Sequence, residues 1–384
     1  MFLPQNIILK VRNRKYMKLG ILTYHRTTNY GAIFQTYALQ QFILSKNIDC
    51  EVIDYLNKTL KRRYSLNPLK KDNIKQSVKS IINIRDNIIL KRKFVKFLNE
   101  NISLSCNSYD EKNIVLSNGV YDRFIVGSDQ VWNLKLSGND INYYLNFVEN
   151  DHGKNSYAAS FGINQFEKEE LNEINELLRK FSNISVREKQ GVDLLNKLEI
   201  ENVNQNIDPV FLLDKNKWEK FTNKRIKKEK YIFVYEITYT PNLIDYAKHI
   251  AKKMNCDVVF VSGSNRKVKG FINLNKLSPV EFLTYLKYSE YVVTSSFHGT
   301  AFSIIFEKKF NYDLPKRKGN TGSRLTSLAN LLNLGDREIL PNFDECVVRE
   351  IDYSKVKEII KVEIEKSNNY IEKVIEKREK NGKD

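Results

Sequence analysis

The fold is decided by residues 19–55, LGILTYHRTTNYGAIFQTYALQQFILSKNIDCEVIDY. Residues 19–24 are a short apolar run typical of a β-strand, and residues 50–55 form a second run of this kind. Between them, residues 34–43 carry apolar side chains at helical spacing. Strand, helix and strand in this order make a βαβ unit, in which the helix is the crossover that parallel strands need. The stretch therefore predicts the beginning of a parallel α/β sheet.

The same alternation continues along the rest of the chain. In the first half, we expect further strands within residues 122–132, 155–162 and 183–195, and residues 207–214 close this half. In the second half, strands at 231–237, 256–263 and 291–296 alternate with helices at 241–254 and 279–288. The chain has 384 residues, more than the ~250–300 at which a single core stops growing. The prediction is an α/β fold with two Rossmann-like, doubly wound domains whose parallel sheets face a cleft.

The domain boundaries are expected where the composition changes. The expected parts are an N-terminal domain, a polar and basic linker, a C-terminal domain and a helical tail, at residues 17–214, 215–230, 231–345 and 350–384. The start of a helix is the alternative for the linker. Residues 1–16 are expected to be a disordered extension, because a much more protein-like stretch begins at Met17. Either Met1 or Met17 can then be the true start.

The chain is basic, with 63 Lys and Arg against 46 Asp and Glu and a net charge of +17. This excess fits an anionic partner, or a Lys-rich solvated surface, which is the commoner case. Residues 70–100 concentrate basic side chains on a helical pattern. Such a helix contacts a membrane surface or, more often, packs one apolar face on its own domain. Four widely spaced cysteines favour reduced thiols and a cytoplasmic setting, with peripheral membrane contact as an option.

Ligands of open parallel sheets bind beyond the carboxyl ends of the strands, so the loops after strands carry the candidate residues. The candidates for an acceptor site or cleft are His25, Asn29, Gly31, Ser128 and Trp132. Asp129 is a candidate to orient a sugar hydroxyl or to act as a catalytic base. Its alternative role is to stabilise its own turn. Trp132 can stack on a sugar or belong to the core, and the core is the commoner place for such a ring.

Two further residues stand at strand ends with chemistry suited to an anion. Arg187 follows the strand ISV, and its guanidinium fork binds carboxylate or phosphate, unless it forms only a surface pair with Glu188. His298 lies in the turn TSSFHGT between a strand and a helix, where it faces a ligand or caps its own helix. The helix start also offers backbone donors to an anion. The donor-binding candidates are therefore Arg187, Ser296, Gly299 and Thr300, with His298 and Asp129 as catalytic candidates.

Several familiar motifs are missing from the sequence. It contains no G-x-x-x-x-G-K-[ST] phosphate loop, no G-x-S-x-G elbow and no H-E-x-x-H metal motif. The first βα turn also lacks G-x-G-x-x-G, which disfavours a nicotinamide-binding domain. We therefore expect no metal and no bound cofactor.

Six segments in order carry a family resemblance: ILTYHRTTNYGAIFQTYAL, FIVGSDQVWN, YAASFG, ISVRE, DPVFLL and SSFHGTAFSIIF. Together they resemble the polysaccharide pyruvyl transferase family over roughly residues 17–340. The resemblance implies two Rossmann-like domains arranged as in GT-B glycosyltransferases. It implies transfer of a pyruvyl group from phosphoenolpyruvate to two hydroxyls of one sugar, as a cyclic ketal. Arg187 matches the family's anion-binding Arg and His298 its catalytic His, whereas Ala32 stands where relatives often have Asp in N-x-G-D.

The expected partners are phosphoenolpyruvate and a sugar or lipid-linked oligosaccharide acceptor of a bacterial surface polysaccharide, with no nucleic acid. Two other functions remain open at this point. One is a GT-B glycosyltransferase that uses a nucleotide sugar, since the same fold and a basic cleft would serve. The other is a non-catalytic basic protein that binds an anion or a membrane through residues 70–100, although no RRM, KH or helix-turn-helix signature is present.

Overall fold

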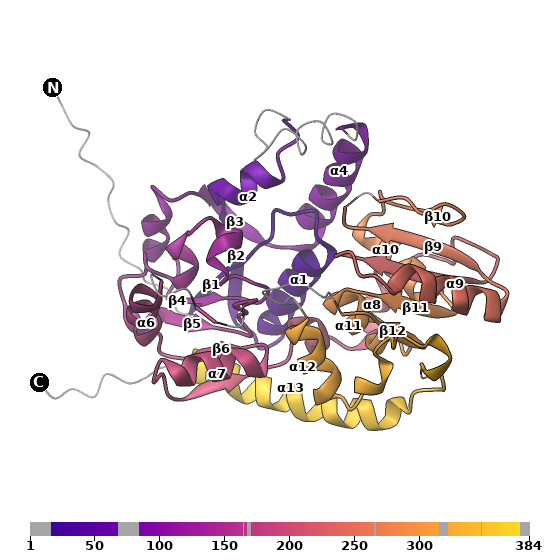
Figure 1. The fold of residues 1–384 in the computed structure, drawn as a ribbon. Coiled ribbons are helices and arrows are strands. Elements are labelled where there is room, and N and C mark those ends of the chain that lie inside the picture. The colour runs from indigo at the N-terminus through magenta and orange to yellow at the C-terminus, as the bar shows by residue number, and fades with distance from the viewer. Residues whose placement is uncertain are drawn as a thin grey trace, which may run out of the picture.

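Two parallel sheets with the same strand order form the framework (Figure 1). The computed structural model describes residues 17–67, 84–163, 165–166, 170–264, 266–314, 322–346 and 348–376. The first sheet has the order β3 (Leu104–Tyr109), β2 (Asp49–Tyr55), β1 (Lys18–Leu22), β4 (Arg123–Val126) and β5 (Lys154–Ser156). The second has β10 (Ile272–Asn273), β9 (Asp257–Ser262), β8 (Tyr231–Glu236), β11 (Tyr291–Thr294) and β12 (Phe310–Tyr312). Each is Rossmann-like, which confirms the predicted fold class.

The first sheet is extended by a pair of short parallel strands, β6 (Ile184–Val186) and β7 (Val203–Gln205). Isolated bridges from Asn155 to Asn183 and from Ala159 to Val186 join this pair to β5 and to the segment directly after it. The carboxyl ends of β4, β5 and β6 therefore lie near one another.

Helices cover both sheets. Those of the first half are α1 (Tyr30–Leu44), α2 (Lys58–Arg63), α4 (Ile84–Asn101), α5 (Leu134–Ser137), α6 (Leu171–Arg179) and α7 (Lys189–Lys197). Those of the second half are α8 (Lys215–Glu219), α9 (Leu243–Met254), α10 (Pro279–Lys287), α11 (Phe297–Ile305), α12 (Ser323–Leu331) and α13 (Tyr353–Ile375). None of these helices, which are those of the described residues, is long and apolar enough to cross a bilayer.

Helix α1 joins the two halves, because it is apolar on nearly every side. Tyr30 stacks on Phe282 of α10 with ring centroids 4.1 Å apart, and Phe34 packs edge-on against Phe302 of α11 at 4.9 Å. Phe34 also meets Trp218 of α8 at 5.6 Å. A helix that buries all its faces is enclosed by protein, here by its own sheet and by the second half.

The predicted linker is only partly a linker. Residues 215–219 form helix α8, as the alternative interpretation had it, and Trp218 is fully buried with its indole N–H donating to the Val210 carbonyl. The single large aromatic ring of Trp218 anchors this segment to the core. The polar composition of the stretch did not indicate this attachment.

The basic insertion is described from residue 84 onward, so the first part of residues 70–100 lies outside the described residues. Helix α4 buries Phe94, Phe97 and Leu98, as expected of a helix that packs one apolar face on its domain. It also contacts the second half, since Lys93 Nζ lies 2.7 Å from the carboxylate of Glu281 in α10. The first 16 residues likewise lie outside the described part.

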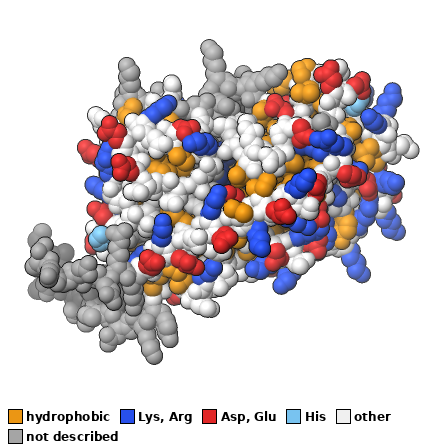
Figure 2. Space-filling model, turned by 90° about the horizontal axis from the view of Figure 1, so that it is seen from below, with side chains coloured by type: hydrophobic (Ala, Val, Ile, Leu, Met, Phe, Trp, Pro, Cys, Tyr) orange, Lys and Arg blue, Asp and Glu red, His pale blue; other side chains and the backbone are white. Residues whose placement is uncertain are grey.

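The last helix, α13, crosses from the second half back to the first. Near its start, the Tyr353 hydroxyl donates to the Lys308 carbonyl at 2.5 Å, and near its end the Tyr370 hydroxyl donates to the Ser156 carbonyl of β5 at 2.6 Å. Figure 2 shows the face of the molecule around α13, on which basic and acidic side chains are interspersed. The basic side chains on this face are thus mixed with acidic ones, as on an ordinary solvated protein surface.

Candidate active site

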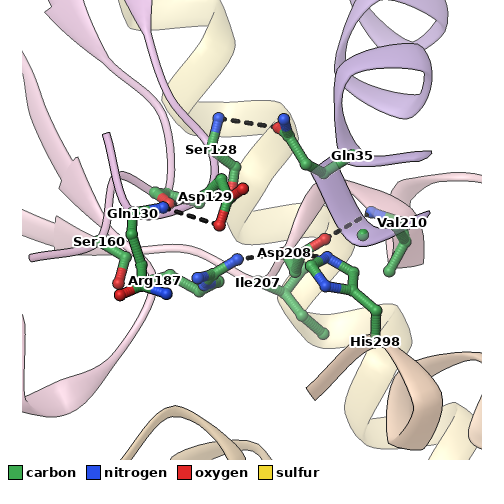
Figure 3. A network of polar contacts seen from close by, with 12 residues as sticks. Gln35, Ser128, Asp129, Gln130, Ser160, Arg187, Ile207, Asp208, Val210 and His298 are labelled. Atoms are coloured by element: carbon green, nitrogen blue, oxygen red, sulfur yellow. Dashed lines mark hydrogen bonds and ion pairs between the residues drawn. The ribbon is translucent and has the colours of Figure 1, made fainter. Parts of the chain in front are cut away.

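The candidate site lies between the two halves, around the carboxylate of Asp208 (Figure 3). Arg187 reaches it from the end of β6, and His298 reaches it from the first turn of α11. Arg187 Nη1 lies 2.6 Å from Asp208 Oδ2, and His298 Nε2 lies 3.4 Å from the same oxygen. Two residues predicted to act on one ligand from different domains therefore converge on a shared carboxylate.

Arg187 is buried, with only 5% of its surface exposed, yet only part of its guanidinium is paired. Nη1 donates to Asp208, and the carboxylate of Glu188 is 3.8 Å from Nε. Nε and Nη2 are buried and make no hydrogen bond. The guanidinium also stacks 4.7 Å from the ring centroid of Phe297. Buried, unpaired donors are costly, so they indicate a binding partner such as an anion.

His298 is positioned by the start of two helices. Ser296 caps α11, because its hydroxyl oxygen accepts from the Gly299 N–H at 3.2 Å. Hence the imidazole does not cap its own helix. Gly31, near the start of α1, lies against the ring so closely that a Cβ there would stand 2.0 Å from His298 Nδ1. The glycine of the Asn29–Tyr30–Gly31 sequence makes room for the histidine of the other half.

Asp208 is the first residue of the DPVFLL segment, and nothing in the sequence marks it as a site residue. Burial alone would raise the pKa of its carboxyl, but His298, Arg187 and the Val210 N–H together hold that pKa well below its usual value. The carboxylate is therefore ionised, and it balances one positive charge of the cluster. It can also hold the imidazole of His298 in place, since the two groups lie 3.4 Å apart.

Arg324, the second residue of α12, is a further site residue that the sequence did not indicate. Burial and the neighbouring charge of Arg187 lower the pKa of Arg324 to about 10, against the opposing effects of Asp129, Glu188 and Asp208. Its Nε is buried without a hydrogen-bond partner. An arginine whose charged form is disfavoured in this way gains from a bound anion.

Asp129 lies close to this cluster. Its carboxylate accepts from the Gln130 N–H at 2.8 Å, and its charge acts on Arg187, Arg324 and Tyr24. The residue has a left-handed backbone with φ of 66°, which an aspartate tolerates better than most residues. It holds its own turn, as one interpretation had it, and its catalytic role stays a prediction.

Two predicted acceptor contacts are wrong. Trp132 is buried, with its indole N–H donating to the Tyr143 carbonyl and its ring stacked over Tyr144. Ser128 is fully buried, and its hydroxyl donates to the Ala158 carbonyl. Neither side chain is exposed to a sugar, because the turn after β4 directs them into the core of the first half.

Of the remaining predicted residues, some are available to a ligand and others are occupied by contacts within the protein. His25 is buried on Asp54, with Nε2 3.1 Å from its Oδ1, but still lines a cavity. Asn29 caps α1 by accepting from the Gly31 and Ala32 N–H groups. The Gly299 N–H is occupied by Ser296, so this pair does not offer the donor that was expected for an anion. By contrast, the Thr300 hydroxyl is buried without a hydrogen-bond partner.

A small cavity of about 20 Å³ adjoins the cluster between the halves. It is lined by Arg187 and Asp208 from the first half, Phe297 and Arg324 from the second, and Glu363 from α13. Among the described residues, no group of three or more His, Cys, Asp and Glu side chains is placed to hold a metal ion. The chemistry that this arrangement supports is anion binding beside an acid–base histidine.

Comparisons with known proteins give both a family and structural relatives. Solved structures with a similar fold include UDP-GlcNAc 2-epimerase from Methanocaldococcus jannaschii, with a TM-score of 0.48 and 14% identity over 91% of this chain and 93% of that one. Another is Streptomyces sp. SF2575 glycosyltransferase SsfS6, with a TM-score of 0.38 and 10% identity over 91% and 96%. No curated protein matches. The family model described as polysaccharide pyruvyl transferase matches residues 29–311, and the chain therefore belongs to the polysaccharide pyruvyl transferase family of enzymes.

Proposed function

We propose that the enzyme transfers a pyruvyl group from phosphoenolpyruvate to two hydroxyls of one sugar of a surface polysaccharide or its precursor, forming a cyclic ketal. The observation that carries the proposal is the set of buried, unpaired donors around Asp208. Arg187 Nε, Arg187 Nη2 and Arg324 Nε lie buried without hydrogen-bond partners next to an acid–base histidine. Phosphoenolpyruvate carries a carboxylate and a phosphate, both of which such donors bind.

The donor would be held by the two arginines. Arg187 keeps one nitrogen on Asp208 and offers the other two to the substrate, which fits a two-pronged bond to a carboxylate or phosphate. Arg324 would supply the second positive charge. The anion would then relieve the repulsion between Arg187 and Arg324 that lowers the pKa of Arg324.

His298 would move the proton that starts the reaction. Protonation of the CH₂ carbon of phosphoenolpyruvate leaves an oxocarbenium-like centre on the adjacent carbon, and a sugar hydroxyl attacks this carbon. Loss of phosphate regenerates such a centre, and the second hydroxyl closes the ring. One hydroxyl proton replaces the proton placed on the methyl group, and the other leaves with inorganic phosphate as HPO₄²⁻. Asp208 would stabilise the imidazolium form of His298 between these steps.

The proposal is tested by incubating the enzyme with phosphoenolpyruvate and a panel of glycans and lipid-linked sugars. Phosphate release that depends on one member of the panel supports it, and a His298→Ala variant serves as the inactive control. Isothermal calorimetry with nucleotide sugars separates it from a glycosyltransferase. Binding of a nucleotide sugar, with no binding of phosphoenolpyruvate, would contradict it.

A further inference from the structure

A second and larger cavity lies in the first half, apart from the Asp208 cluster. It has a volume of about 240 Å³. Its lining comes mainly from the segments at the carboxyl ends of β1 and β2 and from two helices. Helix α4 presents Lys91, Phe94, Val95 and Leu98, which are spaced so that they share one helix face. Helix α2 and its end present Leu60, Lys61 and Tyr64.

The lining combines aromatic rings with positive charge. Four tyrosines line the cavity: Tyr24, Tyr55, Tyr64 and Tyr143. The Tyr24 hydroxyl is buried, with 5% of the residue exposed, and makes no hydrogen bond. Tyrosine rings offer flat faces and hydroxyl groups, the combination that suits a sugar ring. The buried Tyr24 hydroxyl, like the donors of Arg187, indicates a polar ligand.

Among the described residues that line the cavity there are three cations, Arg26, Lys61 and Lys91, and no carboxylate. Arg26 is balanced, because its Nη2 donates to the Asp54 carboxylate at 2.7 Å. Lys61 and Lys91 form no ion pair with any residue in the described part of the chain. They reach the cavity from two different helices, so a charged group between them would be held from both sides. A phosphate has the matching charge.

The cavity is close to the proposed reaction centre. Thr28 lines it, and Gly31, three residues further on, touches the His298 ring. Three residues span at most about 11 Å. Asp129 is near both sites, because its charge acts on Tyr24 and Tyr64 of the cavity and on Arg187 of the cluster. A sugar in the cavity is thus within reach of a group bound at His298.

From this arrangement we propose that the cavity between α2 and α4 is the acceptor subsite and that it takes a glycosyl phosphate, with the sugar among the tyrosines and the phosphate between Lys61 and Lys91. That the bound sugar is the acceptor rests on the proposed function. That the cavity binds a glycosyl phosphate rests only on the residues that line it. The shared chemistry is a sugar joined to phosphate, whether the phosphate is free or carries a lipid.

Two variants test the site by binding alone. Val95→Trp fills the cavity from a position that is 37% exposed, so the core need not rearrange. Val115→Trp, at a 43% exposed valine outside the cavity, is its matched control. Lys61→Gln with Lys91→Gln removes the charge, and Lys96→Gln, on the same helix but outside the cavity, is the control. Melting curves establish that each variant is folded.

The probes are hexose 1-phosphates, the corresponding methyl glycosides, and the same sugars on a short polyprenyl diphosphate in micelles, measured by calorimetry. We expect a 1-phosphate to bind at least tenfold more tightly than its methyl glycoside. Val95→Trp and the double lysine variant should each weaken this binding about tenfold or more, and the controls should leave it unchanged. Equal affinity for the free and the lipid-linked phosphate identifies a soluble acceptor, and a tenfold preference for the second identifies a lipid-linked one.

Normal binding in either Val95→Trp or the double lysine variant overturns the inference, as does equal binding of the neutral glycoside. Phosphoenolpyruvate binding is measured in parallel and separates the two proposals. If phosphoenolpyruvate binds but the variants do not affect the glycosyl phosphate, the subsite is wrong and the function stands. If the glycosyl phosphate binds as described but phosphoenolpyruvate does not bind, the function is wrong and the subsite stands.

Discussion

The substitution Gly31→Ala tests how the two halves position His298. A Cβ at residue 31 would stand 2.0 Å from His298 Nδ1, whereas ordinary contacts begin at 3.4 Å. The imidazole must therefore retreat by about 1.4 Å, which would also separate its Nε2 from Asp208. Misplacement of a catalytic group by ~1 Å can cost about 10²-fold in rate. We expect turnover to fall by about this factor, measured as phosphate release from phosphoenolpyruvate.

The free energy of unfolding tests the contact between Gly31 and His298 in a second way. Overpacking costs ~1–3 kcal/mol, while replacing Gly by Ala in a helix gains up to ~1 kcal/mol. In the wild-type background, Gly31→Ala should therefore lower the free energy of unfolding by about 0–3 kcal/mol. In a His298→Ala background the clash is gone, so Gly31→Ala should stabilise by up to ~1 kcal/mol. A double-mutant cycle by chemical denaturation measures the difference. Equal effects of Gly31→Ala in both backgrounds would refute the described packing.

Substitutions at three residues of the cluster, Arg187, His298 and Asp208, give further predictions. Arg187→Lys keeps the charge but loses the fork, so calorimetry should show phosphoenolpyruvate binding weakened by about tenfold or more; equal affinity would contradict the role of Arg187. His298→Ala should lower turnover by about 10²–10⁴-fold with the fold intact, and near-normal turnover of His298→Gln would mean that His298 only orients the donor. Asp208→Asn should destabilise by ~3–5 kcal/mol at pH 7, because it leaves buried positive charge unpaired. Because the pKa of Asp208 is depressed in the folded state, the stabilisation by its carboxylate is present above about pH 4 and is lost as the pH falls. The difference in the free energy of unfolding between wild type and Asp208→Asn should therefore narrow in acid. A difference that stays constant with pH would argue against the ion cluster.

The fold was predictable because its signals are local. The run of residues 19–55 contains strand, helix and strand next to one another, and β1, α1 and β2 occur where the pattern predicts them. The long apolar pattern of α1 also held a signal that was missed. A helix with so many apolar faces must be covered on more than one side, and here the second half covers it.

The site was only partly predictable, because its residues meet through the fold. Arg187 and His298 could be found, since each stands at a strand end with suitable chemistry. Asp208 lies between them in space but is 21 residues from Arg187, and nothing in the sequence pairs the two. Arg324 sits inside a helix without a distinguishing pattern, and only its burial beside Arg187 reveals it.

The errors have a physical reason as well. Ser128 and Trp132 belong to the same turn as Asp129, but neighbouring residues of a turn can point in opposite directions. Asp129 stays near the cluster, whereas Trp132 enters the core of the first half. A sequence motif locates a turn but does not give the orientation of each of its side chains.

The decisive measurement for pyruvyl transfer is phosphate release from phosphoenolpyruvate, followed together with the mass of the acceptor in the presence of a panel of glycans and glycosyl phosphates. One phosphate should be released for each pyruvyl ketal formed, and both products should be lost in His298→Ala and strongly reduced in Arg187→Lys. Release of a nucleotide from a nucleotide sugar, with no turnover of phosphoenolpyruvate on any acceptor, would contradict it.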